Sequence, residues 1–186
     1  MAHLGSVQGS NTERASGVTL PEMLISLAVI AALAAGAVHS MAGFVQETRM
    51  AGEVNRLVLA LHLARSEAIK RGRRTVLCPA TVNGRCADRA GWENGWLLFA
   101  SDNREREPDE PLIRMAPPLA SFIGMRSGNH RKRIVYQVDG SCGGTNSSFT
   151  FCDAHRLARP RVICLSNTGR PRVTFTRCDG RPITCP

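Results

Sequence analysis

Arginines near the C-terminus are the residues of this chain whose type and spacing best suit a binding chemistry. Gly169-Arg170-Pro171-Arg172 lies between two predicted strands. Glycine permits a tight turn and proline stiffens it, so both guanidinium groups can project without a large ordering cost. A planar guanidinium forms charge-assisted hydrogen bonds to phosphate oxygens. The pattern indicates a phosphate-binding turn, and a solvated hairpin without a specific partner is the alternative.

Further cations surround this turn in the sequence. Only Asp153 and Asp179 oppose the neighbouring arginines, which are Arg156, Arg159, Arg161, Arg177 and Arg181. A second basic cluster either extends a phosphate track or forms a soluble loop; it comprises Arg126, His130, Arg131, Lys132 and Arg133. No aromatic residue is interleaved with either cluster, so stacking on a single strand is not predicted. We expect sequence-independent contact with the backbone of double-stranded DNA, which the net charge of +9 favours.

Metal and catalytic motifs are weak or absent in the sequence. The acidic loop 102–110 lacks the glycine and the alternating Asp/Asn spacing of an EF-hand. Cys152-x-x-His155 with Cys164 could supply three zinc ligands, but a disulfide between the two cysteines is favoured. There is no HExxH, Walker loop or nucleophile elbow, and the glycine-rich turn 140–145 has no P-loop lysine. We therefore predict that the protein is not an enzyme and uses no metal or cofactor.

All seven cysteines follow the apolar N-terminal part of the chain, and none forms a CxxC pair. Behind a membrane segment, disulfides in an oxidising compartment are expected, with free cytosolic thiols as the alternative. The sequence leaves the connectivity open because one cysteine is left over. Proximity favours the pairs Cys78–Cys86, Cys152–Cys164 and Cys178–Cys185.

An apolar segment organises the N-terminal part. Between Val18 and Val45 the only ionisable side chains are Glu22 and His39, so this stretch is long and apolar enough to enter a bilayer. A carboxylate at the start of such a segment requires a partner or a function. Thr19-x-x-Glu22 can also be read as a helix capping box. We expect no regular structure in residues 1–16.

Helical periodicity continues beyond the apolar segment and then gives way to strands. Apolar residues recur at three- and four-residue steps up to Ala68, and Gly72 supplies a stop, which predicts one helix over about 19–71. Seven short strands are then predicted, over 75–78, 96–99, 112–115, 134–138, 149–151, 161–165 and 173–176. One long helix followed by strands indicates an α+β protein with mostly antiparallel sheets.

The residues at the start of the apolar segment resemble a processing signal. Gly17-Val18-Thr19-Leu20-Pro21-Glu22 followed by an apolar helix is similar to the class III signal of type IV pilins and pseudopilins. The resemblance implies cleavage after Gly17 by a prepilin peptidase and methylation of the new amine on Val18. It also implies that Glu22 pairs with the N-terminal amine of a neighbouring subunit. Two residues depart from the family pattern: Val18 replaces the usual phenylalanine, and Pro21 replaces an aliphatic residue.

Three further segments resemble the FimT/FimU minor pilins and the pseudopilin GspH. They are Ala64–Arg71 running into Val76-Leu77-Cys78, Trp92-x-x-Gly95-Trp96-x-x-Phe99 followed by Asp102-Asn103, and Ser166-x-x-Gly169-Arg170. The resemblance covers roughly residues 17–175. It implies a leader at 1–17, a pilin helix at 18–71 whose first part crosses the membrane, and a disulfide-containing β domain of two sheets at 72–186.

The family resemblance also implies a location and partners. The protein is expected in the inner membrane as a single-pass chain with a periplasmic C-terminal domain, and then in the extracellular pilus beside other minor and major pilins. In FimT-like pilins a similar Gly-Arg-x-Arg loop is associated with DNA uptake in natural transformation. The expected DNA-binding residues are therefore Gly169, Arg170, Arg172, Arg161, Arg177 and Arg181. The alternatives are a tip subunit that primes pilus assembly for adhesion or twitching, and a GspH-like pseudopilin of type II secretion.

Overall fold

A computed structural model describes residues 17–88, 91–101, 108, 111–128 and 131–185, apart from the side chains of residues 35–40. Its contacts divide the chain into two compact units, Met1–Ser40 and Met41–Pro186. Helix α1 spans Leu20–Arg71, within one residue of the predicted start. The apolar side chains described between Val18 and Leu33 are exposed. Within the described residues, no helical stretch combines the length and the apolar character needed to cross a bilayer.

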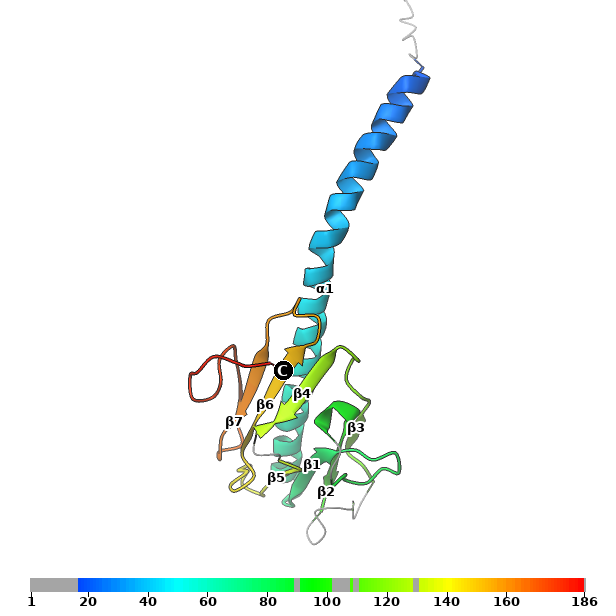
Figure 1. Cartoon of the computed structure of the whole chain (residues 1–186). Coiled ribbons are helices and arrows are strands. Elements are labelled where there is room, and N and C mark those ends of the chain that lie inside the picture. The colour runs from blue at the N-terminus through cyan, green and yellow to red at the C-terminus, as the bar shows by residue number, and fades with distance from the viewer. Residues whose placement is uncertain (1–16, 89–90, 102–107, 109–110, 129–130, 186) are drawn as a thin grey trace, which may run out of the picture. The chain divides into compact units, whose positions relative to one another are not determined.

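In the second unit, α1 buries one face against two sheets (Figure 1). The buried positions follow the predicted three- and four-residue steps and include Met50, Val54, Leu57, Leu61, Ala64 and Ala68. The Thr75 hydroxyl donates to the Ala64 carbonyl oxygen at 2.8 Å, which ties the first strand to the last turns of the helix. The protein is therefore an α+β protein whose long helix packs on two antiparallel four-stranded sheets.

The first sheet has the order β3-β2-β1-β5 and is antiparallel throughout. Its strands are β1 Thr75–Pro79, β2 Trp96–Ala100, β3 Arg114–Ala116 and β5 Ile134–Tyr136. Both faces of β1 and β2 are buried. Leu77 and Leu98 join the helix core, while Val76 and Phe99, on the opposite face, belong to a second hydrophobic cluster. A short 3-10 helix, η1 (Trp92–Asn94), precedes β2.

The second sheet has the order β4-β6-β7-β8 and is also antiparallel. Its strands are β4 Ile123–Ser127, β6 Ser147–Asp153, β7 Arg161–Leu165 and β8 Pro171–Thr174. Phe149, Phe151 and Ile163 project from the face that joins the helix core, which we call the inner face. Thr150 and Val162 alternate with them and project from the opposite, outer face.

The structure corrects several strand predictions. The strand expected at 112–115 begins at Arg114, the one at 134–138 ends at Tyr136, and the one at 173–176 is β8, shifted two residues toward the N-terminus. Strand β4 was not predicted because Gly124 and Arg126 interrupt the apolar pattern. Both residues lie on the outer face of an edge strand, whose inner face carries Ile123 and Met125.

The disulfides confirm one predicted pair and contradict two. Cys78–Cys86 forms, whereas Cys152 pairs with Cys185 and Cys164 pairs with Cys178. Cys164 lies opposite Ser148 in the β6–β7 ladder. Cys152 is therefore displaced along the ladder by four residues, or about 14 Å, well beyond the Cα separation that a disulfide spans. The remaining cysteine, Cys142, is buried and free.

Candidate functional site

The β7–β8 turn, residues 166–170, carries the first of the two arginines that the sequence singled out. Gly169 is buried with φ +74°, and its N–H donates to the Ser166 carbonyl oxygen at 2.9 Å. The hydroxyls of Ser166 and Thr168 lie 2.8 Å apart. This positive φ is the conformation that glycine adopts without strain, so the sequence prediction of a glycine-dependent turn agrees with the backbone.

Three hydrogen bonds hold this turn against strand β5 of the first sheet and against Cys142, which lies in the segment that follows β5. The Tyr136 hydroxyl donates to the Gly169 carbonyl oxygen at 3.2 Å. Cys142 donates twice, from its backbone N–H to the Asn167 carbonyl oxygen at 2.9 Å and from its thiol to the Ser166 carbonyl oxygen at 3.0 Å. Burial raises the pKa of both Tyr136 and Cys142, so both side chains keep the protons they donate. The turn is therefore held in one position before any ligand arrives.

Sequence reasoning missed Tyr136 and Cys142 as parts of this site. Their contacts with the turn join residues far apart in the chain, and neither residue belongs to a local motif. The one available signal was that Tyr136 is the only tyrosine in the sequence.

Arg170 and Arg172 are both exposed, and among the described residues neither forms a salt bridge. Arg172 lies within β8, opposite Cys164, and so projects from the outer face rather than from a loop between strands as predicted. Arg170 remains on the turn. The structure thus brings two guanidinium groups, neither of them in a salt bridge with a described residue, to one end of the second sheet.

Arg161 occupies a different environment from these two arginines. It projects from the inner face, where its Nη2 atom lies 2.5 Å from Oε1 of Glu47 on α1, and its guanidinium lies 5.5 Å from the centre of the Phe175 ring. The hydrogen bond from Arg161 and the backbone N–H of Arg159 lower the pKa of Glu47. Arg161 therefore links the helix to the sheet, and its role in binding DNA stays a prediction.

Arg177 and Arg181 lie on the C-terminal segment, residues 175–185. Arg181 Nη2 is 2.6 Å from Asp179 Oδ2, and Arg177 Nε is 3.7 Å from the same oxygen. The pKa of Asp179 is lowered, chiefly by the hydrogen bond from Arg181. One carboxylate is thus shared by two exposed arginines, which leaves this segment with a net positive charge.

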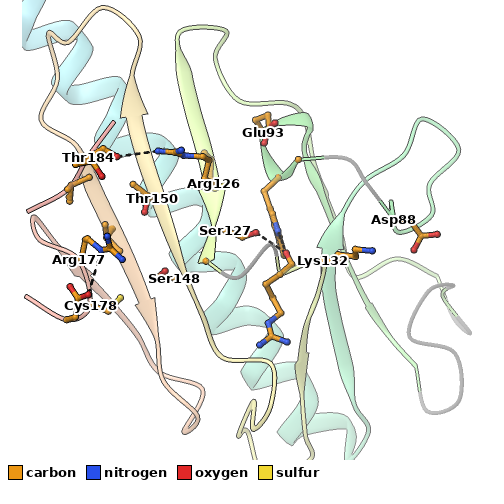
Figure 2. Close-up of a pocket in the computed structure, with 18 residues that line it drawn as sticks. Asp88, Glu93, Arg126, Ser127, Lys132, Ser148, Thr150, Arg177, Cys178 and Thr184 are labelled. Atoms are coloured by element: carbon orange, nitrogen blue, oxygen red, sulfur yellow. Dashed lines mark hydrogen bonds and ion pairs between the residues drawn. The ribbon is translucent and has the colours of Figure 1, made fainter. Parts of the chain in front are cut away.

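A groove of about 840 Å³ lies over the outer face of the second sheet (Figure 2). The disulfides to Cys152 and Cys164 hold the C-terminal segment along this face, because both cysteines alternate with inner-face residues. Arg126 reaches from β4 across the groove and donates to the Thr184 carbonyl oxygen at 3.3 Å. Of the second basic cluster, Arg126, Arg131 and Lys132 line the groove, while His130 lies outside the described residues.

The structure does not support a zinc site made of Cys152, His155 and Cys164. Cys152 and Cys164 are each consumed by a disulfide to the C-terminal segment, so they do not join His155 as zinc ligands. Within the described part of the chain, no three His, Cys, Asp or Glu side chains are placed to hold a metal ion. Most of the acidic loop 102–110 lies outside the described residues.

The predicted processing residues precede or begin α1. Gly17 and Val18 lie before the helix, and Glu22 is exposed in its first turn. The first helical hydrogen bond runs from the Met23 N–H to the Thr19 carbonyl oxygen at 3.2 Å. The geometry leaves the Glu22 carboxylate accessible to a partner group.

Comparison with known proteins places these features in context. The family model described as type II transport protein GspH matches residues 53–169, and the model for the prokaryotic N-terminal methylation motif matches residues 14–38. The chain is similar in structure to the type IV minor pilin FimU of Pseudomonas aeruginosa PAO1, with a TM-score of 0.57 and 17% identity over 70% of this chain and 92% of that one. A second crystal form of FimU gives a TM-score of 0.51 and 17% identity over 64% and 88%. No curated protein matches the chain.

Proposed function

Because the chain belongs to the GspH family of pilin-like proteins and carries the N-terminal methylation motif, we propose that it joins a type IV pilus as a minor pilin and binds extracellular DNA there for uptake in natural transformation. The family consists of structural proteins and not of enzymes. The methylation motif implies processing by a prepilin peptidase and assembly with other pilins. In this proposal the chain is held in the inner membrane until assembly, with its C-terminal domain in the periplasm.

The pair Arg170 and Arg172 carries the DNA part of the proposal. Both side chains are exposed and lack a salt bridge within the described residues, and the turn between them and β7 is fastened by Tyr136 and Cys142. A guanidinium that is free of carboxylates and already positioned can bind a phosphate without first breaking another contact. Such contacts read the DNA backbone and not the base sequence.

Replacing both arginines, Arg170→Gln with Arg172→Gln, is expected to weaken duplex binding on every sequence. Loss of two phosphate contacts flattens the plot of log affinity against log salt by about two. The measurement is a salt series of fluorescence anisotropy with the mature chain in neutral detergent and a labelled random duplex. The matched control, Arg114→Gln with Arg156→Gln, removes the same charge from β3 and from the 154–160 connection. Unchanged affinity and slope in the Arg170/Arg172 variant would remove this site, and a parent chain that binds no duplex would remove the DNA function.

Processing is tested separately, at the N-terminus. Gly17→Leu is expected to leave the full-length precursor uncleaved, because the peptidase that recognises the motif cuts after this glycine. Mass spectrometry of the purified chain measures whether Val18 is the first residue and whether its amine is methylated. Gly9→Leu, in the same leader, is the control and should be processed normally. A mature N-terminus at Val18 in the Gly17 variant would contradict the assignment.

A second candidate function is a pseudopilin of a type II secretion system. The description of the matching family model favours it, since that model is named for type II transport. Processing and assembly are the same in this role, but no affinity for DNA is expected. The salt series above therefore separates the two functions.

A further inference from the structure

Strand β8 is an edge strand of the second sheet, and one side of its backbone has no hydrogen-bond partner within the part of the chain that the structure describes. Next to the β7–β8 turn, the Ser166 N–H donates to the Arg170 carbonyl oxygen at 3.5 Å. Hydrogen-bonded pairs recur at every second residue of an antiparallel ladder, so Cys164 and Arg172 form the next such pair. The N–H and carbonyl groups of Val173 therefore point away from β7, toward the open side of the sheet.

Two other edges of the sheets are closed by hydrogen bonds of their own. On β5, the Val135 N–H donates to the Thr145 hydroxyl at 3.0 Å. On β4, the opposite edge of the second sheet, the Ile123 N–H donates to the Ala120 carbonyl oxygen at 2.8 Å. Native proteins cover or block edge strands because unpaired backbone groups are a template for another strand. The described residues place no such partner on β8, so its open side is available to another chain.

The side chains along this edge differ between the two faces of the sheet. On the outer face, Arg172 is exposed and forms no salt bridge with a described residue. On the inner face, Val173 lies opposite Ile163 at the margin of the core and is 41% exposed. Phe175 follows β8 and is 60% exposed, with its ring centre 5.5 Å from the inner-face guanidinium of Arg161. The edge therefore offers a cation on one face and an apolar surface on the other.

These two surfaces determine which strand fits beside β8. Successive side chains of a strand point to opposite faces of the sheet, so an added strand places every second residue beside Arg172 and the others beside Val173 and Phe175. Acidic residues next to Arg172 and apolar residues next to Val173 form favourable cross-strand pairs. A second copy of β8 fits less well, because this strand carries an arginine and no acidic residue.

We propose that β8 accepts an extended segment of a partner protein by β-strand addition, and that acidic and apolar residues alternate along this segment. In this mode of recognition, backbone hydrogen bonds to Val173 supply affinity and the alternating side chains supply specificity. The inference does not depend on DNA binding, because the partner is a polypeptide and its main contact is the backbone of Val173. Arg172 takes part in both contacts, so a bound segment and a DNA phosphate exclude each other at this side chain.

The probe for this site is a fluorescent peptide of about eight residues in which glutamate and valine alternate. The mature chain in neutral detergent is expected to bind the peptide in a saturable manner, measured by fluorescence anisotropy. Two matched peptides are the controls, one with lysine in place of glutamate and one in which the same glutamates and valines are grouped in pairs. Both should bind about tenfold more weakly or worse, because the first reverses the charge beside Arg172 and the second loses the alternation.

Val173→Pro tests the backbone contact directly. It removes the N–H that points to the open side and leaves in place the N–H groups that bond to β7, which is why an edge strand tolerates proline there. Peptide binding should fall by about tenfold or more. Val173→Thr keeps the N–H and a β-branched side chain, and should bind within about twofold of the parent. Circular dichroism of both variants measures whether the sheet is retained.

Hydrogen exchange of the parent gives a measurement that needs no variant. The peptide should slow exchange of the Val173 amide by about tenfold or more, while the Arg172 amide, which already bonds to β7, changes little. Unchanged exchange at Val173 would overturn strand addition. So would parent-like peptide binding by Val173→Pro, equal binding of the three peptides, or a parent that does not bind the alternating peptide. A parent that forms dimers without peptide, and that Val173→Pro makes monomeric, would identify a second copy as the occupant and overturn the acidic segment.

Discussion

Replacing Asp153 by alanine is expected to lower the free energy of unfolding by about 3 kcal/mol, or about 10 °C in Tm. Asp153 is only 6% exposed, and its carboxylate accepts three backbone N–H groups, from His155 at 3.0 Å and from Leu157 and Ala158 at 2.9 Å each. Without it, these donors lose an ionised acceptor at the point where the chain connects β6 to β7. The same connection delivers the Arg159 N–H to Glu47 on α1, so the helix contact should weaken as well.

Thermal unfolding followed by circular dichroism measures this effect. Asp139→Ala is the matched control, because Asp139 is an exposed aspartate that accepts one backbone N–H, from Ser141 at 2.9 Å. Its loss should change Tm far less. Equal Tm shifts in the two variants would show that the Asp153 hydrogen bonds contribute no special stability.

The same carboxylate predicts an acid dependence of stability. Burial raises the pKa of Asp153, but the N–H groups of Ala158, His155 and Leu157 together outweigh it and hold the pKa below the usual 3.8. A lowered carboxyl pKa stabilises the fold fully above the unfolded value, and this contribution is lost as the pH falls through the folded value. Asp153→Asn should therefore be less stable than the parent at neutral pH, with the difference shrinking as the solution is acidified below about pH 4.

The fold could be predicted from sequence wherever one local pattern dominates. The spacing of Met50, Val54, Leu57 and Leu61 marks both the helix and its buried face, and β1, β2 and β7 follow from short apolar runs. Strand β4 could not be read in this way because an edge strand needs only one apolar face, and its other face carries Gly124 and Arg126. The sequence therefore left the second basic cluster open, either as an extension of a phosphate track or as a loop, and the structure places only Arg126 of its described members on a strand.

The site depended on long-range information that the sequence does not contain. Gly169, Arg170 and Arg172 are recognisable from a local motif, whereas the inward direction of Arg161 follows only from the register that places it with Phe151. Proximity also failed for Cys152 and Cys164, because neighbouring antiparallel strands separate residues that differ in position along the ladder. Binding of DNA by the arginine turn, processing at Gly17 and Val18, and pairing by Glu22 stay predictions.

Replacing Gly169 by alanine is expected to destabilise the protein by about 3–5 kcal/mol and to weaken duplex binding as much as loss of both arginines does. At φ +74° any side chain is strained, and a Cβ atom here would also overlap the carbonyl oxygen of Gly140 and approach Cε1 of Tyr136 to 2.8 Å. Backbone atoms cannot rotate away as a flexible side chain can. The turn must therefore move, which breaks the Tyr136–Gly169 hydrogen bond and displaces Arg170.

Gly144 offers a control for the conformational part of this cost. Its φ of +77° is nearly the same, but a Cβ atom added there meets nothing within 4 Å. Gly144→Ala should therefore lose only the about 1–2 kcal/mol of a left-handed alanine and keep the parent's DNA affinity. Denaturant unfolding and the duplex salt series on both variants measure the difference. If the two variants were equally stable and bound the duplex equally well, the contact between the turn and Gly140 would have no part in positioning the arginines. If Gly169→Ala alone fails in both assays, the packing of this turn against the first sheet is what makes two ordinary arginines a binding site.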